Sequence, residues 1–205
     1  QCACVTSSIL KASLIATNVL DVATSQGGNV GAAPHTLILT HDGTVYSFGN
    51  NSNGQLGRNS DAFALLPVDL PAVNSKVVGI SAGHDHSLIL FENGELYGIG
   101  NNTNGQLGTT NLGGSVNKFI KLADNVTSMA AGRRHTIFVR DSKAYAIGDN
   151  RWYKLSTSSE SVITTPVKIL DNAKKVVAGE HSSFIIDNNN DLYYIGWRST
   201  STYVT

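Results

Sequence analysis

Four histidines at nearly regular spacing are the first candidates for chemistry in this chain. His35, His86, His135 and His181 are separated by 51, 49 and 46 residues. Histidine is a common metal ligand and acid–base group. Such regular spacing indicates a repeated structural unit, and residues at equivalent positions of successive repeats lie in different parts of the fold. The four histidines are therefore not expected to lie within ligand distance of one another. No carboxylate shares their position, and we therefore expect strand-end histidines that hydrogen-bond to neighbouring backbone.

Two short motifs resemble a catalytic triad and a phosphate-binding loop, but neither has the structural setting that its chemistry requires. Asp85-His86-Ser87 has the composition of a catalytic triad, but neighbours along a strand point to opposite faces, so His86 cannot take the Ser87 proton. The glycines of the A-G and G-Q-L-G motifs lead into strands or turns, whereas a phosphate loop leads into a helix. The sequence predicts no catalytic residue, no metal site and no cofactor, and hence no enzyme.

The histidines open a repeated hairpin pattern, which is clearest in Ser81–Gly108, SAGHDHSLILFENGELYGIGNNTNGQLG. Two alternating apolar runs flank Asn93-Gly94, and Asp42-Gly43 takes the same place in the preceding unit. Such dipeptides favour two-residue type I′ turns, because both central residues tolerate positive φ. The hairpins close on glycines 51, 48 and 48 residues apart: Gly49, Gly100, Gly148 and Gly196.

A period near 50 residues with several strands per unit predicts a propeller-type array. The units resemble repeats of the regulator-of-chromosome-condensation family, whose pattern runs A-G-x-x-H-[ST], then D-G-x-[VL]-Y-x-[WF]-G-x-N, then G-Q-L-G. Ser81–Gly108 matches nearly all of it, and His35–Gly57 matches from the histidine onward. Ala130–Gly148 and Val177–Gly196 match the front half and lack G-Q-L-G. The resemblance covers about residues 17–197.

The resemblance implies an all-β fold, a β-propeller of four-stranded antiparallel blades. About four repeats are present, which make an arc or part of a seven-bladed ring. Residues 1–16 are expected to be a lead segment or the end of a preceding blade. Residues 17–205 hold the repeats, with units at about 17–70, 76–122, 125–170 and 174–205, the last incomplete. The rest of the propeller is expected from the same, longer chain.

Composition narrows the class of partner. The formal net charge is zero, so the basic excess typical of phosphate-binding proteins is missing and direct nucleic-acid binding is not expected. No apolar run is long enough to predict a membrane span. Cys2 and Cys4 are the two cysteines, and nothing nearby completes a zinc set. An intracellular location is favoured, because nothing in the chain demands an oxidising compartment.

The loops that vary between otherwise similar units are the candidate binding site. Between the glycine and histidine motifs stand His84-Asp85, Arg133-Arg134 and Glu180, and these equivalent loops should share one face. Unit three replaces the S-N-G-Q and T-N-G-Q of its neighbours with Arg151-Trp152-Tyr153-Lys154. Residues 130–154 carry a net charge of +4, which suits an acidic protein surface. The alternative is a solvated patch with Trp152 filling the space left by the lost glycine.

The function implied is a protein–protein interaction module or scaffold that binds a partner through loops on one face. The family also includes a nucleotide exchange factor for a nuclear GTPase, so a guanine-nucleotide exchange factor acting on a small GTPase is the alternative. A secreted inhibitor or adhesin propeller is the second alternative. One fold hosts many activities, and the repeats alone do not choose between them.

Overall fold

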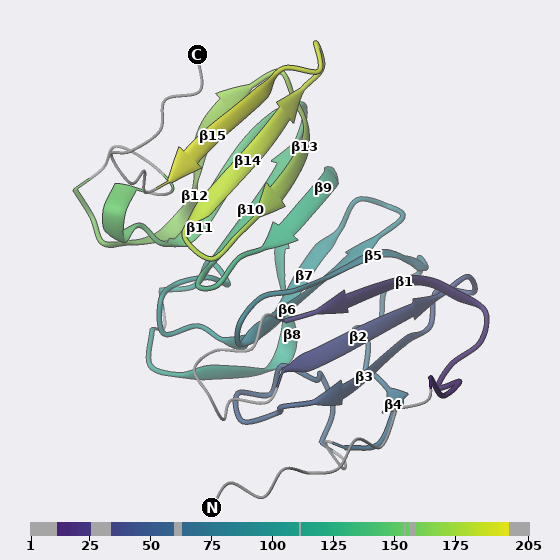
Figure 1. The fold of residues 1–205 in the computed structure, drawn as a ribbon. Coiled ribbons are helices and arrows are strands. Elements are labelled where there is room, and N and C mark those ends of the chain that lie inside the picture. The colour runs from purple at the N-terminus through teal and green to yellow at the C-terminus, as the bar shows by residue number, and fades with distance from the viewer. Residues whose placement is uncertain are drawn as a thin grey trace, which may run out of the picture.

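The computed structural model describes residues 12–25, 34–59, 63–110, 112–153, 155 and 159–196, with Trp152 described by its backbone alone. Four antiparallel sheets follow one another along the chain (Figure 1). The first sheet comprises β1 (Val19–Thr24), β2 (His35–Thr40), β3 (Val45–Gly49) and β4 (Leu66–Pro67). The second comprises β5 (Val77–Ala82), β6 (His86–Phe91), β7 (Leu96–Asn101) and β8 (Ser115–Ala123).

The third sheet comprises β9 (Val126–Ala131), β10 (His135–Arg140), β11 (Lys143–Asp149) and β12 (Val162–Asp171), with a short 3-10 helix, η1 (Arg151–Tyr153), between its last two strands. The fourth comprises β13 (Ala173–Ala178), β14 (Ser182–Asp187) and β15 (Leu192–Gly196). Strands are ordered within each sheet as in the chain. The predicted all-β propeller is confirmed, and we number the sheets as blades 1 to 4.

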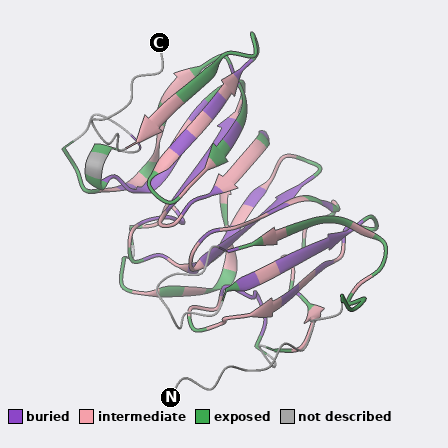
Figure 2. Ribbon diagram, in the orientation of Figure 1, coloured by how far each residue is buried: buried purple, intermediate pink, exposed green. Residues whose placement is uncertain are grey.

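The blades stack face to face in chain order, with blades 1 and 4 at the two ends of an arc (Figure 1). Because side chains alternate along a strand, the second strands of blades 1 to 3, which bury residues on both faces, are continuous apolar runs, whereas β14 of blade 4 buries only every other residue. Leu37 and Leu39 of blade 1 pack against Ile89 of blade 2. Leu88 and Leu90 pack in turn against Phe138 of blade 3. Buried residues accordingly follow the middles of the strands (Figure 2).

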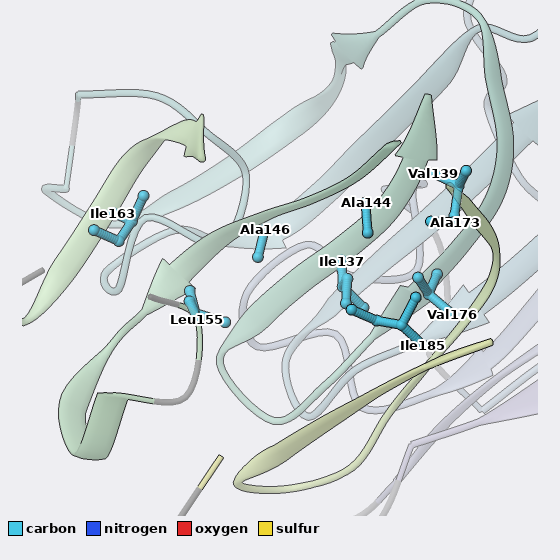
Figure 3. Packing of buried hydrophobic residues seen from close by; sticks show 9 residues of the cluster. All are labelled: Ile137, Val139, Ala144, Ala146, Leu155, Ile163, Ala173, Val176 and Ile185. Carbon is cyan, nitrogen blue, oxygen red and sulfur yellow. The ribbon is translucent and has the colours of Figure 1, made fainter. Parts of the chain in front are cut away.

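Between blades 3 and 4 the same arrangement is seen from close by in Figure 3. Ile137 of β10 lies against Ile185 of β14, Val139 lies beside Ala173 of β13, and all four side chains are buried in one cluster. Each joint therefore buries apolar residues of one blade's second strand against apolar residues of the next blade. Apolar burial of this kind is the main favourable contribution to folding in such arrays.

The hairpin turns lie at the predicted positions, but those at Asp42-Gly43 and Asn93-Gly94 differ from the predicted type I′. Gly43 N donates to Thr40 O, and Thr40 N donates to Thr44 O, so the loop has three residues. Gly43 has φ +87°, whereas Asp42 has no positive φ. This is a type I turn followed by a left-handed residue that forms a G1 bulge. The Asn93-Gly94 turn is built in the same way, with φ +85° at Gly94.

The type I′ turn occurs instead in blade 3, where no glycine is present. Arg140 pairs directly with Lys143, and the two residues between them, Asp141 and Ser142, have φ values of 50° and 54°. Asp and Ser are short polar residues, and Asp tolerates this region better than most. The absence of glycine from this turn therefore does not free it from the positive-φ requirement.

The fourth unit is shifted by one residue relative to the sequence alignment. In the first three blades the histidine pairs with the closing glycine, as His86 does with Gly100 and His135 with Gly148. In blade 4 the residue opposite Gly196 is Ser182, not His181. A Cβ on Gly132 would collide with the His135 ring, and the corresponding neighbour of Gly179 is the Ser182 hydroxyl. His181 thus lies in the loop, and Ser182 stands in the histidine position.

Candidate functional site

Three buried histidines join each blade to the next. In each case Nε2 of the histidine lies 2.9–3.1 Å from a hydroxyl on the following blade. The pairs are His35 with Ser87, His86 with Thr136, and His135 with Ser183. The acceptor stands one residue after the histidine position of its own blade. The sequence predicted bonds to neighbouring backbone, and that expectation was wrong in detail because the partner is a side chain one blade further on.

The direction of the bonds fixes the protonation state of these rings. Ser87 Oγ donates to Gln55 O over 2.7 Å, and Thr136 Oγ1 donates to Gln106 O over 2.8 Å. A hydroxyl that donates its proton to a carbonyl accepts from the ring, so Nε2 carries the hydrogen. Burial lowers the pKa of His35 to about 4 and that of His86 to about 3. Both imidazoles are neutral structural donors at neutral pH.

These positions rule out two kinds of site on the described residues. The three rings lie in three different joints, and the described part of the chain gathers no three His, Cys, Asp or Glu side chains around a common point. Ser87 bonds to His35 of the preceding blade and not to its neighbour His86. Asp85 lies 2.7 Å from His84 Nδ1 instead. The Asp85-His86-Ser87 sequence is therefore not an assembled triad.

Within each blade, the variable loop lies at the same edge of the sheet as the loop that follows the third strand. Asn101 N donates to Asp85 O over 2.8 Å, and Asp149 N donates to Arg134 O over 2.9 Å. Both bonds join a loop after a first strand to the residues that end a third strand. We call the surface formed by these two kinds of loop the loop face. Arg133-Arg134 and η1 both belong to it.

Most charges on the loop face are paired within the molecule. Arg133 of blade 3 forms an ion pair with Glu180 of blade 4, and His181 Nε2 lies 3.4 Å from the same carboxylate. Arg151 donates from Nε and Nη2 to the two oxygens of Asp149, over 2.8 and 2.7 Å. These two hydrogen bonds to the Asp149 carboxylate are the main reason that the pKa of Arg151 is raised.

The window 130–154 does not form one basic patch, which corrects the sequence-based reasoning. Arg140 and Lys143 flank the β10–β11 turn, at the opposite end of blade 3 from Arg133. Arg140 lies over the ring of Tyr145, 4.4 Å from its centroid. Arg133 and Arg151 are paired with carboxylates. The net charge of +4 is therefore divided between the two ends of blade 3. On the loop face, the carboxylates of Glu180 and Asp149 offset the charges of Arg133 and Arg151.

The loop of unit three keeps the backbone of its neighbours while changing its side chains. Leu155 N donates to Asn150 Oδ1 over 3.1 Å, as Leu107 N does to Asn102 Oδ1 over 2.9 Å. Leu155 is buried like Leu107. The predicted alignment of residues 151–154 with the N-G-Q motif therefore agrees with the geometry. Lys154 and the Trp152 side chain lie outside the described parts of the structure.

Tyr153 is the unusual residue of this loop. It has φ +54° and stands where units one and two have Gly54 and Gly105, with φ values of +77° and +72°. A bulky residue in this region is a true outlier and costs about 1–3 kcal/mol, which points to function when nothing else explains it. Its side chain is 64% exposed on the loop face. Tyr153 was among the candidate binding residues predicted from the sequence. Its alignment with Gly54 and Gly105 was the sequence feature that could have predicted its left-handed conformation.

A groove of about 720 Å³ runs along the inner side of the arc. Its walls are the first strands of the four blades, with small residues such as Ala23, Ser81 and Ala130. His84, Arg133 and Glu180 stand at its edge. Of the sequence-predicted residues, the structure thus brings Arg133 and Glu180 together and places His84 on the same groove, with Asp85 bonded to it. Arg151 and Tyr153 do not line the groove and belong to the loop face.

Four sheets whose strands run in order, stacked through equivalent joints, define a β-propeller architecture. A family model of the regulator of chromosome condensation (RCC1) repeat matches residues 42–90 and 93–139, and a second model of that repeat matches residues 77–106. The chain carries RCC1 repeats and belongs to the family built from them. No helix within the described residues is long and apolar enough to cross a bilayer.

Individual relatives agree with this family. Protein RCC2 homolog of Danio rerio is 37% identical over 82% of this chain, and the ultraviolet-B receptor UVR8 of Arabidopsis thaliana is 30% identical over 80%. The chain spans 41% and 39% of their lengths. Among solved structures, human WBSCR16 matches with a TM-score of 0.75 and 22% identity over 90% of this chain and 49% of its own. Yeast RCC1 (Prp20) bound to Kap60 matches with 0.73 and 25%, over 90% and 45%.

Proposed function

We propose that the chain is a protein-interaction module whose partner binds the loop face. The observation that carries the proposal is Tyr153, an exposed aromatic residue held in a strained left-handed conformation on a loop that otherwise copies its neighbours. Exposed tyrosines are frequent binding hot spots, because they combine a large apolar area with a hydroxyl. Membership of a family of interaction propellers supports the same function.

The paired charges refine the chemistry of the partner. Arg133 with Glu180, and Arg151 with Asp149, present both signs beside the aromatic residue. A partner with alternating charges matches this surface better than a uniformly acidic one, because like charges brought into contact are repelled. The first expectation, an acidic protein surface, remains a prediction for Arg134, a partly buried cation at the same end of blade 3.

The test compares the two ends of blade 3. The immobilised chain, the variant Tyr153→Ala with Arg134→Ala, and the variant Lys143→Ala are used to retain proteins from an extract, and the retained proteins are quantified by mass spectrometry. Lys143 is a matched exposed cation at the opposite end of the blade. A defined protein that is retained by the chain and by the Lys143 variant, but lost with the double variant, supports the proposal. Equal retention by all three would contradict it.

Guanine-nucleotide exchange is the second candidate, favoured by the likeness to yeast RCC1 (Prp20) across 90% of this chain. A solved structure of Prp20 from Saccharomyces cerevisiae was described with its binding properties to Gsp1 and histones. Release of fluorescent GDP from purified Gsp1, measured with and without the chain, tests this candidate directly. No acceleration at tenfold molar excess would set it aside. A secreted inhibitor or adhesin remains a prediction from the resemblance.

A further inference from the structure

The connection from blade 1 to blade 2 is longer than the two connections that follow it. Leu66, Ile120 and Val167 hold one equivalent register position in the fourth strands of blades 1, 2 and 3. In blades 2 and 3 the next blade begins six positions after this residue, whereas blade 2 begins at Val77, 11 positions after Leu66. Blade 1 therefore carries five additional residues, at about 69–73. An insertion confined to one repeat of an array often serves binding.

This insertion forms one wall of a pocket of about 370 Å³ at the outer strands of the joint between blades 1 and 2. Leu70 and Pro71 line that wall, residues 117–119 of β8 line the opposite wall, and Ile99 of β7 lies at the base. Ile99 is 1% exposed, so the base is apolar and part of the core. Arg58 is also buried, and it donates to two backbone carbonyls of blade 1, which holds the adjoining lining in place. We call this the rim pocket.

The β8 wall of the rim pocket is a bulge. Residues 117–119 stand opposite the single residue Ile99 of β7, at the point where the register of the two strands shifts. The extra residues of a bulge lie outside the hydrogen-bond ladder, and β8 is the outer strand of its sheet. Their peptide groups are therefore placed to bond to another extended segment. The equivalent bulge of blade 3, residues 164–166, includes Pro166, which has no N–H to donate.

The lining of the rim pocket is apolar at depth and charged at its mouth. Leu70 and Phe119 are half-buried and pack on the core cluster between blades 1 and 2. Lys118 on one wall and Asp69 on the other are exposed. Among the described residues, neither of these two charges has an ion-pair partner. The opposite charges on facing walls are therefore open to a segment that carries both signs.

We propose that the rim pocket binds an extended segment of a partner protein, in which one large apolar side chain lies between an acidic and a basic residue. The apolar side chain, a leucine or phenylalanine, covers Ile99, while the acidic residue faces Lys118 and the basic residue faces Asp69. Main-chain bonds to residues 117–119 hold the segment extended, as in other complexes in which a strand adds to a sheet edge. A volume of about 370 Å³ is near the lower limit of ligand pockets and suits one such side chain.

The rim pocket is a separate site from the proposed partner surface around Tyr153. Neither Tyr153 nor Arg134 lines it, and both residues belong to blade 3. Binding at the rim pocket and binding around Tyr153 can therefore be abolished separately.

Random heptapeptides displayed on phage are selected on the immobilised chain, and the selected peptides are labelled and titrated by fluorescence polarisation. The expected consensus holds a leucine or phenylalanine with one acidic and one basic neighbour, and the expected Kd is about 10–100 µM. Replacement of the apolar residue of the peptide by alanine weakens binding about tenfold or more, because it removes most of the buried apolar area. A selection that yields no peptide with this consensus would overturn the proposal.

Variants of the chain locate the binding site. Asn59→Trp, at an exposed position of the pocket lining, occupies the space and weakens binding of the consensus peptide about tenfold or more. Lys118→Glu weakens it about fivefold, because the new carboxylate repels the acidic residue of the peptide. Lys175→Glu, which changes an exposed cation of β13 in blade 4, is the matched control and leaves the affinity unchanged. All three side chains are exposed, so the circular dichroism spectra and the Tm stay unchanged.

Further measurements separate the rim pocket from other surfaces and other ligands. Addition of the peptide to the ¹⁵N-labelled chain shifts the amide resonances of residues 69, 70 and 117–119. The double variant Tyr153→Ala with Arg134→Ala binds the peptide as tightly as the unchanged chain does. Loss of binding in that variant, or equal binding to Asn59→Trp and Lys118→Glu, would place the peptide elsewhere and refute the proposal. Binding of N-acetylleucine amide as tight as that of the peptide would instead assign the pocket to a small apolar ligand and exclude the partner segment.

Discussion

We call the two successive hydrogen bonds from His86 to Thr136 and from Thr136 to Gln106 the relay. Removal of the Thr136 hydroxyl should destabilise the protein far more than removal of the Thr36 hydroxyl at the equivalent position of blade 1. Thr136→Val keeps the shape of the side chain but deletes the group that accepts from His86 Nε2 and donates to Gln106 O. Both partners are buried and would be left without this bond. Thr36 holds the same repeat position, yet it bonds Thr24 Oγ1 at 3.3 Å near the surface.

The magnitude follows from the buried groups that lose a partner. An unsatisfied buried donor or acceptor costs about 1–3 kcal/mol, so two such groups give a loss of about 2–6 kcal/mol for Thr136→Val. For a domain of this size each kcal/mol shifts the Tm by about 2–4 °C, so we expect a fall of about 4–24 °C. Thr36→Val should lower the free energy of unfolding by less than about 0.5 kcal/mol, because its hydroxyl is close to water.

Urea unfolding followed by circular dichroism, with both variants beside the unchanged chain, provides the measurement. Equal free energies of unfolding for Thr136→Val and Thr36→Val would refute the relay as a stabilising contact. The double variant His86→Phe with Thr136→Val adds a check. If the cost arises from an unsatisfied Nε2 donor, the phenyl ring should recover part of the stability lost in Thr136→Val, since no ring donor remains.

Four other predictions concern protonation, backbone conformation and partner binding. The folded pKa values of His35 and His86 lie below the unfolded value of 6.5, so the unfolded chain binds more protons below that pH and stability falls as the pH drops. The free energy of unfolding, measured by urea titration, should therefore be lower at pH 5 than at pH 7 by about 2 kcal/mol for each ring. Gly94→Val should cost about 1–3 kcal/mol in thermal melts because φ is +85°, whereas Ser142→Gly should raise the Tm, because glycine relieves φ 54°. Tyr153→Gly should leave the free energy of unfolding unchanged or raise it while weakening partner retention, and a large loss of stability would show that the ring is a packing residue.

Much of the fold was predictable because it depends on local alternation and on turn residues. The run HSLILF has to be buried on both faces, and a period near 50 residues places its copies in successive blades. The turn type was not predictable from Asn93-Gly94 alone. The loop takes a third residue, and only the glycine then needs positive φ. Asp141-Ser142 shows the converse, because strand pairing imposes a left-handed turn without glycine.

The candidate site was predictable in position and poorly predictable in chemistry. The alignment placed Arg133-Arg134 and residues 151–154 at adjoining ends of antiparallel strands, and the bond from Asp149 N to Arg134 O agrees with that reasoning. Counting charges along the chain could not show that Arg133 meets Glu180 from another blade, because this contact spans 47 residues. Nor could it reveal that Ser182 holds the histidine position, since that depends on strand register.

The histidine contact also bears on how such a chain can lengthen over evolution. Donor and acceptor are adjacent in one repeat, as His86 and Ser87 are, yet each bonds to a different neighbour. A duplicated segment of about 50 residues therefore brings both halves of the contact with it and fits between existing blades without new complementarity. Blade 4 carries the acceptor Ser183 but has Ser182 in the donor position. Insertions among the first three blades would thus be tolerated at once, whereas a copy added after blade 4 would begin with a joint that lacks its polar contact.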